Sequence, residues 1–233
     1  MSGSGTLPAV APATLVFLRQ LRDNNHRDWF STNRPVYEAA KADWEQFVAR
    51  LIAEIGQFDD ITGLTARECM FRINRDVRFS KDKSPYKVNF GAAIGRGGRH
   101  SKYLDYYLHL EPGNSFLGGG VYAPTGAELI KIRQEIHYNL PEIKKIVEAP
   151  TFAAYFGEVQ GNRLKTTPKG YNRDHPEIEW LRLQQFFFMH AFTDAEVTAP
   201  DFLQKVVEGC RILKPLLDFF NYILYEEESV KEL

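Results

Sequence analysis

Apolar residues recur at every second position through most of the stretch between residues 69 and 122, and this alternation constrains the fold more than any other feature. Such a pattern is typical of β-strands that cover one face of a core. We predict four strands, over residues 69–74, 86–94, 103–110 and 115–122. Short turns between runs of period two predict an antiparallel meander.

Helical periodicity precedes the strands. Residues 14–21 and 24–31 predict two short helical segments, and Arg34-Pro35 opens a longer helix whose apolar residues follow the i, i+3, i+4 spacing of an amphipathic helix. Gly56 is the expected end of this helix.

Helical periodicity also returns after the strands. Thr125 and Glu128 have the spacing of a capping box, which predicts a helix that runs to about Tyr138. We expect further helical segments over residues 141–147 and 151–156, another strand within 183–192 and a long final helix over 200–225.

These patterns predict an α+β fold, with a mainly antiparallel meander sheet that helices cover on one face and with long N-terminal and C-terminal helices. A chain of 233 residues can form one large core or two small domains. Because no linker or repeat is visible, we expect a single domain over residues 14–226. Residues 1–13 are expected to be a flexible tail, and residues 227–233 an acidic tail.

Several classes of protein do not fit the sequence. No apolar run is long enough to span a membrane, and the N-terminus lacks the charged and apolar regions of a signal peptide, so we expect a cytoplasmic location and no membrane partner. Cys69 and Cys210 are too few for a disulfide framework or a zinc site. The histidine spacings indicate no helical zinc site, and no cofactor is identified.

Charge is distributed very unevenly along the chain. The formal net charge is -1, yet residues 67–102 contain ten basic and three acidic residues, a local net charge of +7. The remainder must therefore carry about -8. A basic excess within predicted strands, rather than in a tail, suggests a binding surface.

Strand alternation predicts where this charge is displayed. If Phe71 and Ile73 are buried, Arg72 and Asn74 face the other way. The same reasoning places polar residues of the next two strands on that face: Lys87, Asn89, Asp105, Tyr107 and His109.

Arginine binds carboxylates and phosphates through two parallel hydrogen bonds, whereas lysine acts as a point charge. We therefore predict a site for an anion on this face and on the loop beside it. The structural alternative is a solvated loop edge whose cations form local ion pairs. Asp76 and Asp82 would orient the cations or hold a metal together with a phosphate. The candidate ligand-binding residues are Arg72, Asn74, Arg75, Arg78, Lys81, Lys83, Tyr86, Lys87, Asn89, Tyr107, Gly119, Arg133 and Lys169.

Some of these candidates have a structural alternative. Gly119, within Gly118–Gly120, either lets a ligand approach the backbone or lets a helix pack tightly on the sheet. Arg133 and Lys169 either reach the same site or lie on solvated surfaces. His109 is the first candidate for acid–base catalysis and Asp76 the second, although His109 also fits a hydrogen-bonded residue of the sheet.

The stretch Phe71–Lys87 resembles the signature of an uncharacterised family, domain of unknown function 2461. Three further stretches resemble its pattern: Phe17–Phe30, Gly118–Tyr122 and Leu164–Tyr171. The resemblance extends from about Thr14 to Leu224 and implies one intact domain. The family has no established activity, so the resemblance supplies no mechanism.

Three functions remain open on the sequence. The first is the binding, with or without chemical processing, of a small molecule that carries a phosphate or carboxylate. The second is nucleic-acid binding, in which aromatic residues stack on bases: Phe79, Tyr86, Tyr103 and Tyr107. The third is a non-catalytic scaffold, in which Arg72, Arg75 and Arg78 form ion pairs with the acidic remainder of the chain.

Overall fold

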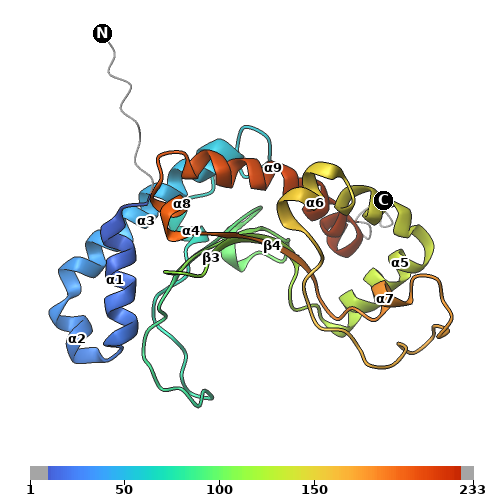
Figure 1. Ribbon diagram of the computed structural model, residues 1–233, viewed down its shortest axis with the longest axis horizontal. Helices are drawn as coiled ribbons and strands as arrows, with labels where there is room; N and C mark the ends of the chain where they lie inside the picture. The colour runs from blue at the N-terminus through green and yellow to red at the C-terminus, as the bar shows by residue number, and fades with distance from the viewer. Residues whose placement is uncertain (1–9, 227–233) are drawn as a thin grey trace, which may run out of the picture. The chain divides into compact units, whose positions relative to one another are not determined.

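The computed structural model describes residues 10–226, and Figure 1 shows their arrangement. Residues 1–9 and 227–233, which include most of the two predicted tails, lie outside the described residues. The elements are α1 (Pro12–Asp23), α2 (Arg27–Thr32), α3 (Arg34–Ile55), α4 (Ala66–Cys69), β1 (Phe90–Ile94), η1 (Gly98–His100), β2 (Tyr106–Leu110), β3 (Ser115–Val121), α5 (Gly126–Val147), α6 (Pro150–Phe156), α7 (Ile178–Leu181), β4 (Phe186–Phe192), α8 (Asp194–Thr198), α9 (Phe202–Asn221) and the π-helical turn η2 (Tyr222–Glu226).

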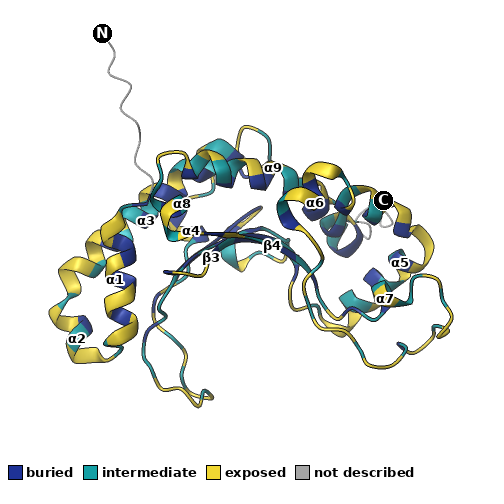
Figure 2. Ribbon diagram, viewed as in Figure 1, coloured by how far each residue is buried: buried dark blue, intermediate teal, exposed yellow. Residues whose placement is uncertain are grey.

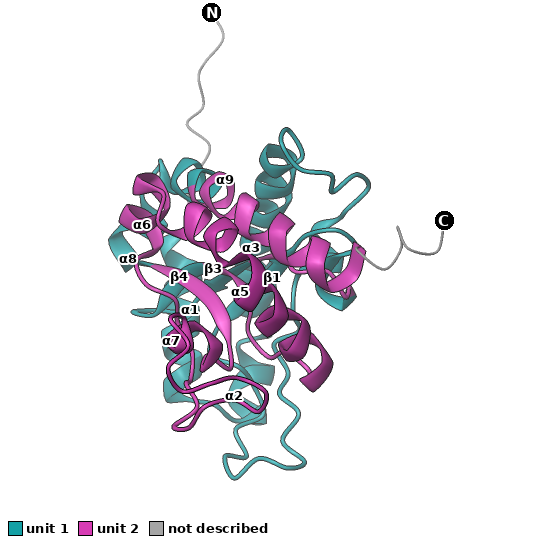
Figure 3. Cartoon of the chain, turned by 90° about the vertical axis from the view of Figure 1, so that its right-hand side faces the viewer, with its two compact units in different colours: residues 1–100, 107–117, 191–208 teal, residues 101–106, 118–190, 209–233 magenta. Residues whose placement is uncertain are grey.

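Contacts within the chain divide it into two compact units, which Figure 3 shows in different colours. Unit 1 comprises residues 1–100, 107–117 and 191–208, and unit 2 comprises residues 101–106, 118–190 and 209–233. The single domain expected over residues 14–226 therefore stays a prediction. Among the residues described, no helix combines the length and apolar character needed to cross a bilayer.

The four strands form one sheet in the order β1-β2-β3-β4, and neighbouring strands are antiparallel. The predicted α+β fold and meander are therefore confirmed. In β2, buried Tyr106, Leu108 and Leu110 alternate with the half-buried Tyr107 and His109, as the period-two pattern predicts. This strand begins at Tyr106, three residues later than expected.

The predicted N-terminal helices are also present. Asp43 of α3 accepts hydrogen bonds from the Ala11 amide (3.0 Å) and the Thr14 hydroxyl (2.6 Å), which attaches the beginning of α1 to α3. One side of α3 is buried, as Figure 2 shows. From this side Trp44 stacks on Phe90 of β1, with ring centroids 6.4 Å apart. Helix α3 thus packs against the first strand of the sheet.

The strand predicted over residues 69–74 is wrong. Residues Ala66–Cys69 form a helical turn, and only two isolated bridges follow it, Met70 to Ala92 and Asn74 to Tyr86. At Cys69 the physical reason is local, because Thr65 and Glu68 form a capping box that stabilises the turn. Met70 and Asn74 are four residues apart, whereas their partners Tyr86 and Ala92 are six residues apart. Because the two spacings differ, no regular ladder forms between the bridges.

Unit 2 contains the helix that the Thr125–Glu128 capping box predicts. The Glu128 amide donates to the Thr125 hydroxyl, and the Glu128 carboxylate accepts from the Thr125 amide. Helix α5 is interrupted at Asn139, where φ is -134°, two residues before Pro141. Proline has no amide hydrogen, and its ring clashes with the carbonyl four residues earlier, so a regular helix cannot continue through Pro141 and the predicted break follows.

The glycines of β3 are required by close packing. An added Cβ on Gly119 would lie 2.7 Å from a methyl group of Leu213 in α9. At Gly120, where φ is +111°, a Cβ would lie 2.3 Å from the Phe186 carbonyl oxygen. This geometry favours the packing alternative for Gly119.

Replacement of Gly120 by alanine should lower the free energy of unfolding by at least about 2 kcal/mol, because it adds both left-handed backbone strain and a clash with a neighbouring backbone. Gly126→Ala is the matched control. It changes the first residue of α5, where no atom lies within 4 Å of the added Cβ, and should alter stability by less than about 1 kcal/mol. Urea unfolding measures both, and equal effects would refute the packing account.

Candidate functional site

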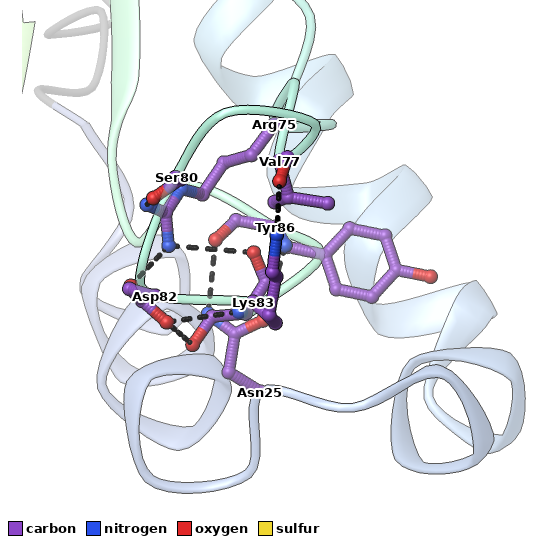
Figure 4. A network of polar contacts seen from close by, with 8 residues as sticks. Asn25, Arg75, Val77, Ser80, Asp82, Lys83 and Tyr86 are labelled. Carbon is purple, nitrogen blue, oxygen red and sulfur yellow. Dashed lines mark hydrogen bonds and ion pairs between the residues drawn. The ribbon is translucent and has the colours of Figure 1, made fainter.

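A two-point hydrogen bond attaches the basic loop to the helices of unit 1. Asn25, between α1 and α2, accepts from the Tyr86 amide at 3.1 Å and donates to the Tyr86 carbonyl at 2.9 Å. The Tyr86 ring is buried and stacks on Phe30, with centroids 3.9 Å apart. These contacts, part of which Figure 4 shows, hold the end of the loop in a fixed position.

A pocket of about 350 Å³ opens beside this attachment, entirely within unit 1. Its volume suits a small ligand. Four predicted ligand-binding residues line it, and Arg22 and Asn25, which sequence reasoning missed, complete one side. The lining consists of Arg22, Asn25, Arg75, Asp82, Ser84, Tyr86, Lys87, Val88 and Asn89.

Arg75 is oriented by its own loop. Its guanidinium forms an ion pair with Asp82 and donates to the Ser84 carbonyl at 3.3 Å. The Ser84 hydroxyl and amide donate to Asp82 at 2.6 and 2.9 Å. These bonds and, after them, Arg75 hold the pKa of Asp82 well below its usual range. Asp82 therefore remains a carboxylate and compensates the charge of Arg75.

Lys87 has a different environment. Its ammonium nitrogen lies 5.3 Å from the centroid of the Phe71 ring, and the side chain is half-buried. Burial, and secondarily the nearby charge of Arg72, lowers the pKa of Lys87. Within residues 10–226, neither Lys87 nor Arg22 forms an ion pair with a carboxylate. The pocket thus contains two positive charges that no acidic side chain compensates.

The remaining cations of the loop lie outside this pocket. Arg78 pairs with Asp76 at 2.6 Å on the exposed surface, and this guanidinium lowers the pKa of Asp76. Lys83 donates to the Val77 carbonyl at 2.9 Å. Other predicted site residues are exposed and do not line the pocket: Arg72, Asn74 and Lys81.

His109 is held at both ring nitrogens. Nε2 lies 3.0 Å from a Glu111 oxygen, and Nδ1 lies 3.2 Å from the Tyr107 hydroxyl and 3.4 Å from the Asn89 amide nitrogen. The ring also stacks on Phe116 at 4.7 Å, and only 12% of the side chain is exposed. This arrangement favours a hydrogen-bonded residue of the sheet. Glu111 was missed, although it continues the alternation of Tyr107 and His109.

Three predicted site residues belong to unit 2. Gly119 lies beneath Leu213 and Leu217 of α9. Arg133 donates to the carbonyls of Leu181 (2.9 Å) and Leu183 (3.4 Å), so its guanidinium fixes the segment after α7. Lys169 is exposed.

Asp105 is partly buried in unit 2, and burial raises its pKa to about 6. The sequence predicted that this residue would share a face with Tyr107 and His109. Asp105 lies just before β2, and its environment is more enclosed than the alternation of the strand indicates. Among residues 10–226, no three His, Cys, Asp or Glu side chains are grouped as metal ligands.

The comparisons identify the family and nothing beyond it. The chain belongs to the family described as conserved hypothetical protein, domain of unknown function 2461, whose model matches residues 13–219. Neither a curated protein nor a solved structure gives a match. Function must therefore be argued from the geometry.

The pKa of Asp105 predicts a pH dependence of stability. The unfolded carboxyl ionises near pH 3.9 and the folded one at about 6, so the unfolded state loses its proton first and stability falls across this window. The loss reaches up to about 3 kcal/mol and persists above pH 6. Asp105→Asn should remove this decline. Urea unfolding at pH 4 and pH 7 measures it, and an unchanged difference between the two pH values would contradict the assignment.

Proposed function

We propose that the chain binds a small molecule carrying a phosphate or carboxylate group, in the pocket beside Lys87. The observation that carries the proposal is a half-buried ammonium group with no carboxylate partner within residues 10–226. Partial burial of a cation is costly unless a counter-charge is supplied. A bound anion would supply it, and would restore the pKa of Lys87 toward its ordinary value.

The other lining residues support the same ligand class. Arg22 adds a second uncompensated charge, and Arg75 is held by Asp82 in a fixed orientation. The Asn89 amide, which contacts His109 Nδ1, adds a neutral polar group to the wall. An anionic group surrounded by arginine, lysine and amide groups is typical of phosphate and carboxylate recognition.

Binding has more support than catalysis. Both ring nitrogens of His109 are occupied by protein groups, and Asp76 is engaged by Arg78. The hypothesis of a non-catalytic scaffold has limited support. It expects ion pairs with the acidic remainder of the chain, but Arg75 and Arg78 pair with aspartates of their own loop.

We infer a cytoplasmic location for this function. The support is compositional, because two cysteines are too few for the disulfide framework of a small secreted domain.

Replacement of Lys87 by methionine, which keeps an unbranched side chain one atom shorter but removes its charge, should weaken anion binding by about ten-fold or more. Calorimetry with inorganic phosphate, sugar phosphates, nucleotides and dicarboxylates measures this. Lys81→Met, on the exposed part of the same loop, is the matched control and should have little effect. The affinity of the unmodified chain for the anion should also fall as the pH rises. Because the pKa of Lys87 is lowered, this fall should begin at a pH below the ordinary lysine pKa. If no anion binds, or if both variants behave alike, the proposal fails.

One observation favours nucleic acid as a second candidate. Phe79 is 96% exposed, and the Arg78 guanidinium lies 5.9 Å from its ring centroid. An exposed ring beside cations can stack on an unpaired base. Tyr86, by contrast, is buried against Phe30 and is not accessible for stacking.

For this second candidate, Phe79→Ala should weaken binding of single-stranded RNA or DNA by about five-fold or more, because stacking on each base contributes about 1–3 kcal/mol. Binding should also weaken steeply with salt. Fluorescence anisotropy at several salt concentrations tests both effects, with Lys87→Met as the comparison variant. A flat salt response, or an unchanged affinity in Phe79→Ala, would exclude this function for the loop.

A further inference from the structure

A second pocket, of about 590 Å³, lies entirely within unit 2 and has different chemistry. Its volume is within the usual range for small-molecule sites, and its walls are largely apolar and aromatic. The apolar walls come from Val147, Val159, Trp180, Leu183 and Phe188.

The charged groups at this pocket are mainly acidic. Three carboxylates and a single cation, Arg163, are among the lining residues. Glu179 is compensated by Arg182, at 3.0 Å. Glu148 and Glu158 are exposed and form no ion pair with any described residue. Arg163 forms none either, so the unpaired side chains of the pocket carry two negative charges and one positive charge. The pocket therefore has an excess of negative charge.

The backbone adds to this negative potential. Helix α5 ends at Val147 with Glu148 as its C-cap, and α6 ends at Phe156 with Gly157 as its C-cap. Both C-caps line the pocket. The last carbonyls of a helix lack intrahelical donors and form the negative end of its dipole. Two helix C-termini and two carboxylates, which outnumber the one unpaired cation Arg163, thus favour a cation at the same place.

Trp180 completes the arrangement, because an indole ring attracts cations through its electron-rich face and also buries apolar groups. We propose that this pocket binds a small organic amine. The ammonium group lies near Glu148 and Glu158, and the apolar body packs against Trp180 and Phe188. This site is independent of the anion pocket in unit 1.

Three probes of nearly equal size separate charge from apolar contact: 2-phenylethylammonium, 2-phenylethanol and 3-phenylpropanoate. Calorimetry at pH 7 and low salt should show that the ammonium ion binds at least about ten-fold more tightly than the alcohol or the carboxylate. Added salt should reduce this preference. Equal affinities for the three probes, tighter binding of the carboxylate, or no binding of the amine would each overturn the proposal.

Variants test the assigned residues. Glu148→Gln combined with Glu158→Gln should lower amine affinity about ten-fold and leave alcohol affinity nearly unchanged. Glu142→Gln, an exposed position of α5 that does not line the pocket, is the matched control and should retain amine binding. Trp180→Phe should retain more affinity than Trp180→Leu, because phenylalanine keeps an aromatic face. An unchanged amine affinity in the double variant would refute the site even if the tryptophan variants fail to fold.

Discussion

The paired hydrogen bonds between Asn25 and Tyr86 join residues that are 61 positions apart, and the candidate anion site depends on them. A loop rich in lysine and arginine would otherwise extend into water, where each charge is solvated at no cost. Because Tyr86 is fixed at its backbone and its ring is buried against Phe30, the adjacent Lys87 is held half-buried beside the pocket. The anchored Tyr86 thereby holds part of the basic loop in place as one wall of the pocket.

Charge counting along the sequence overestimates the field that a ligand would experience. The loop has few acidic residues, but each of its two aspartates compensates an arginine of the same loop. Asp82 pairs with Arg75, and Asp76 pairs with Arg78. Short loops favour such pairs, because closing them costs little entropy. The positive charge that remains at the pocket comes from Lys87 and from Arg22, which belongs to α1 and lies outside the basic segment.

The fold could be predicted where pattern and local chemistry agree, as in the alternation of β2 and the capping box of α5. It was mispredicted at residues 69–74 for two reasons. The Thr65–Glu68 capping box stabilises a helical turn that includes Cys69, and residues 70–74 form only two isolated bridges, Met70 to Ala92 and Asn74 to Tyr86. Arg22 and Asn25 were missed for a different reason. Periodicity reports which face of an element is buried, but it contains no information about contacts between distant segments. Only the fold places the end of α1 beside Lys87.

A net charge of -1 gives no indication of what the described residues can bind. Electrostatic influence in solution decays over about 8 Å at physiological ionic strength, so a ligand responds to the uncompensated groups next to it. These groups are cationic at the pocket of unit 1 and mainly anionic at the pocket of unit 2. Ligand selection by the two proposed sites would therefore be local to each unit. It would follow from which charges lack partners and how far they are buried, rather than from the composition of the chain.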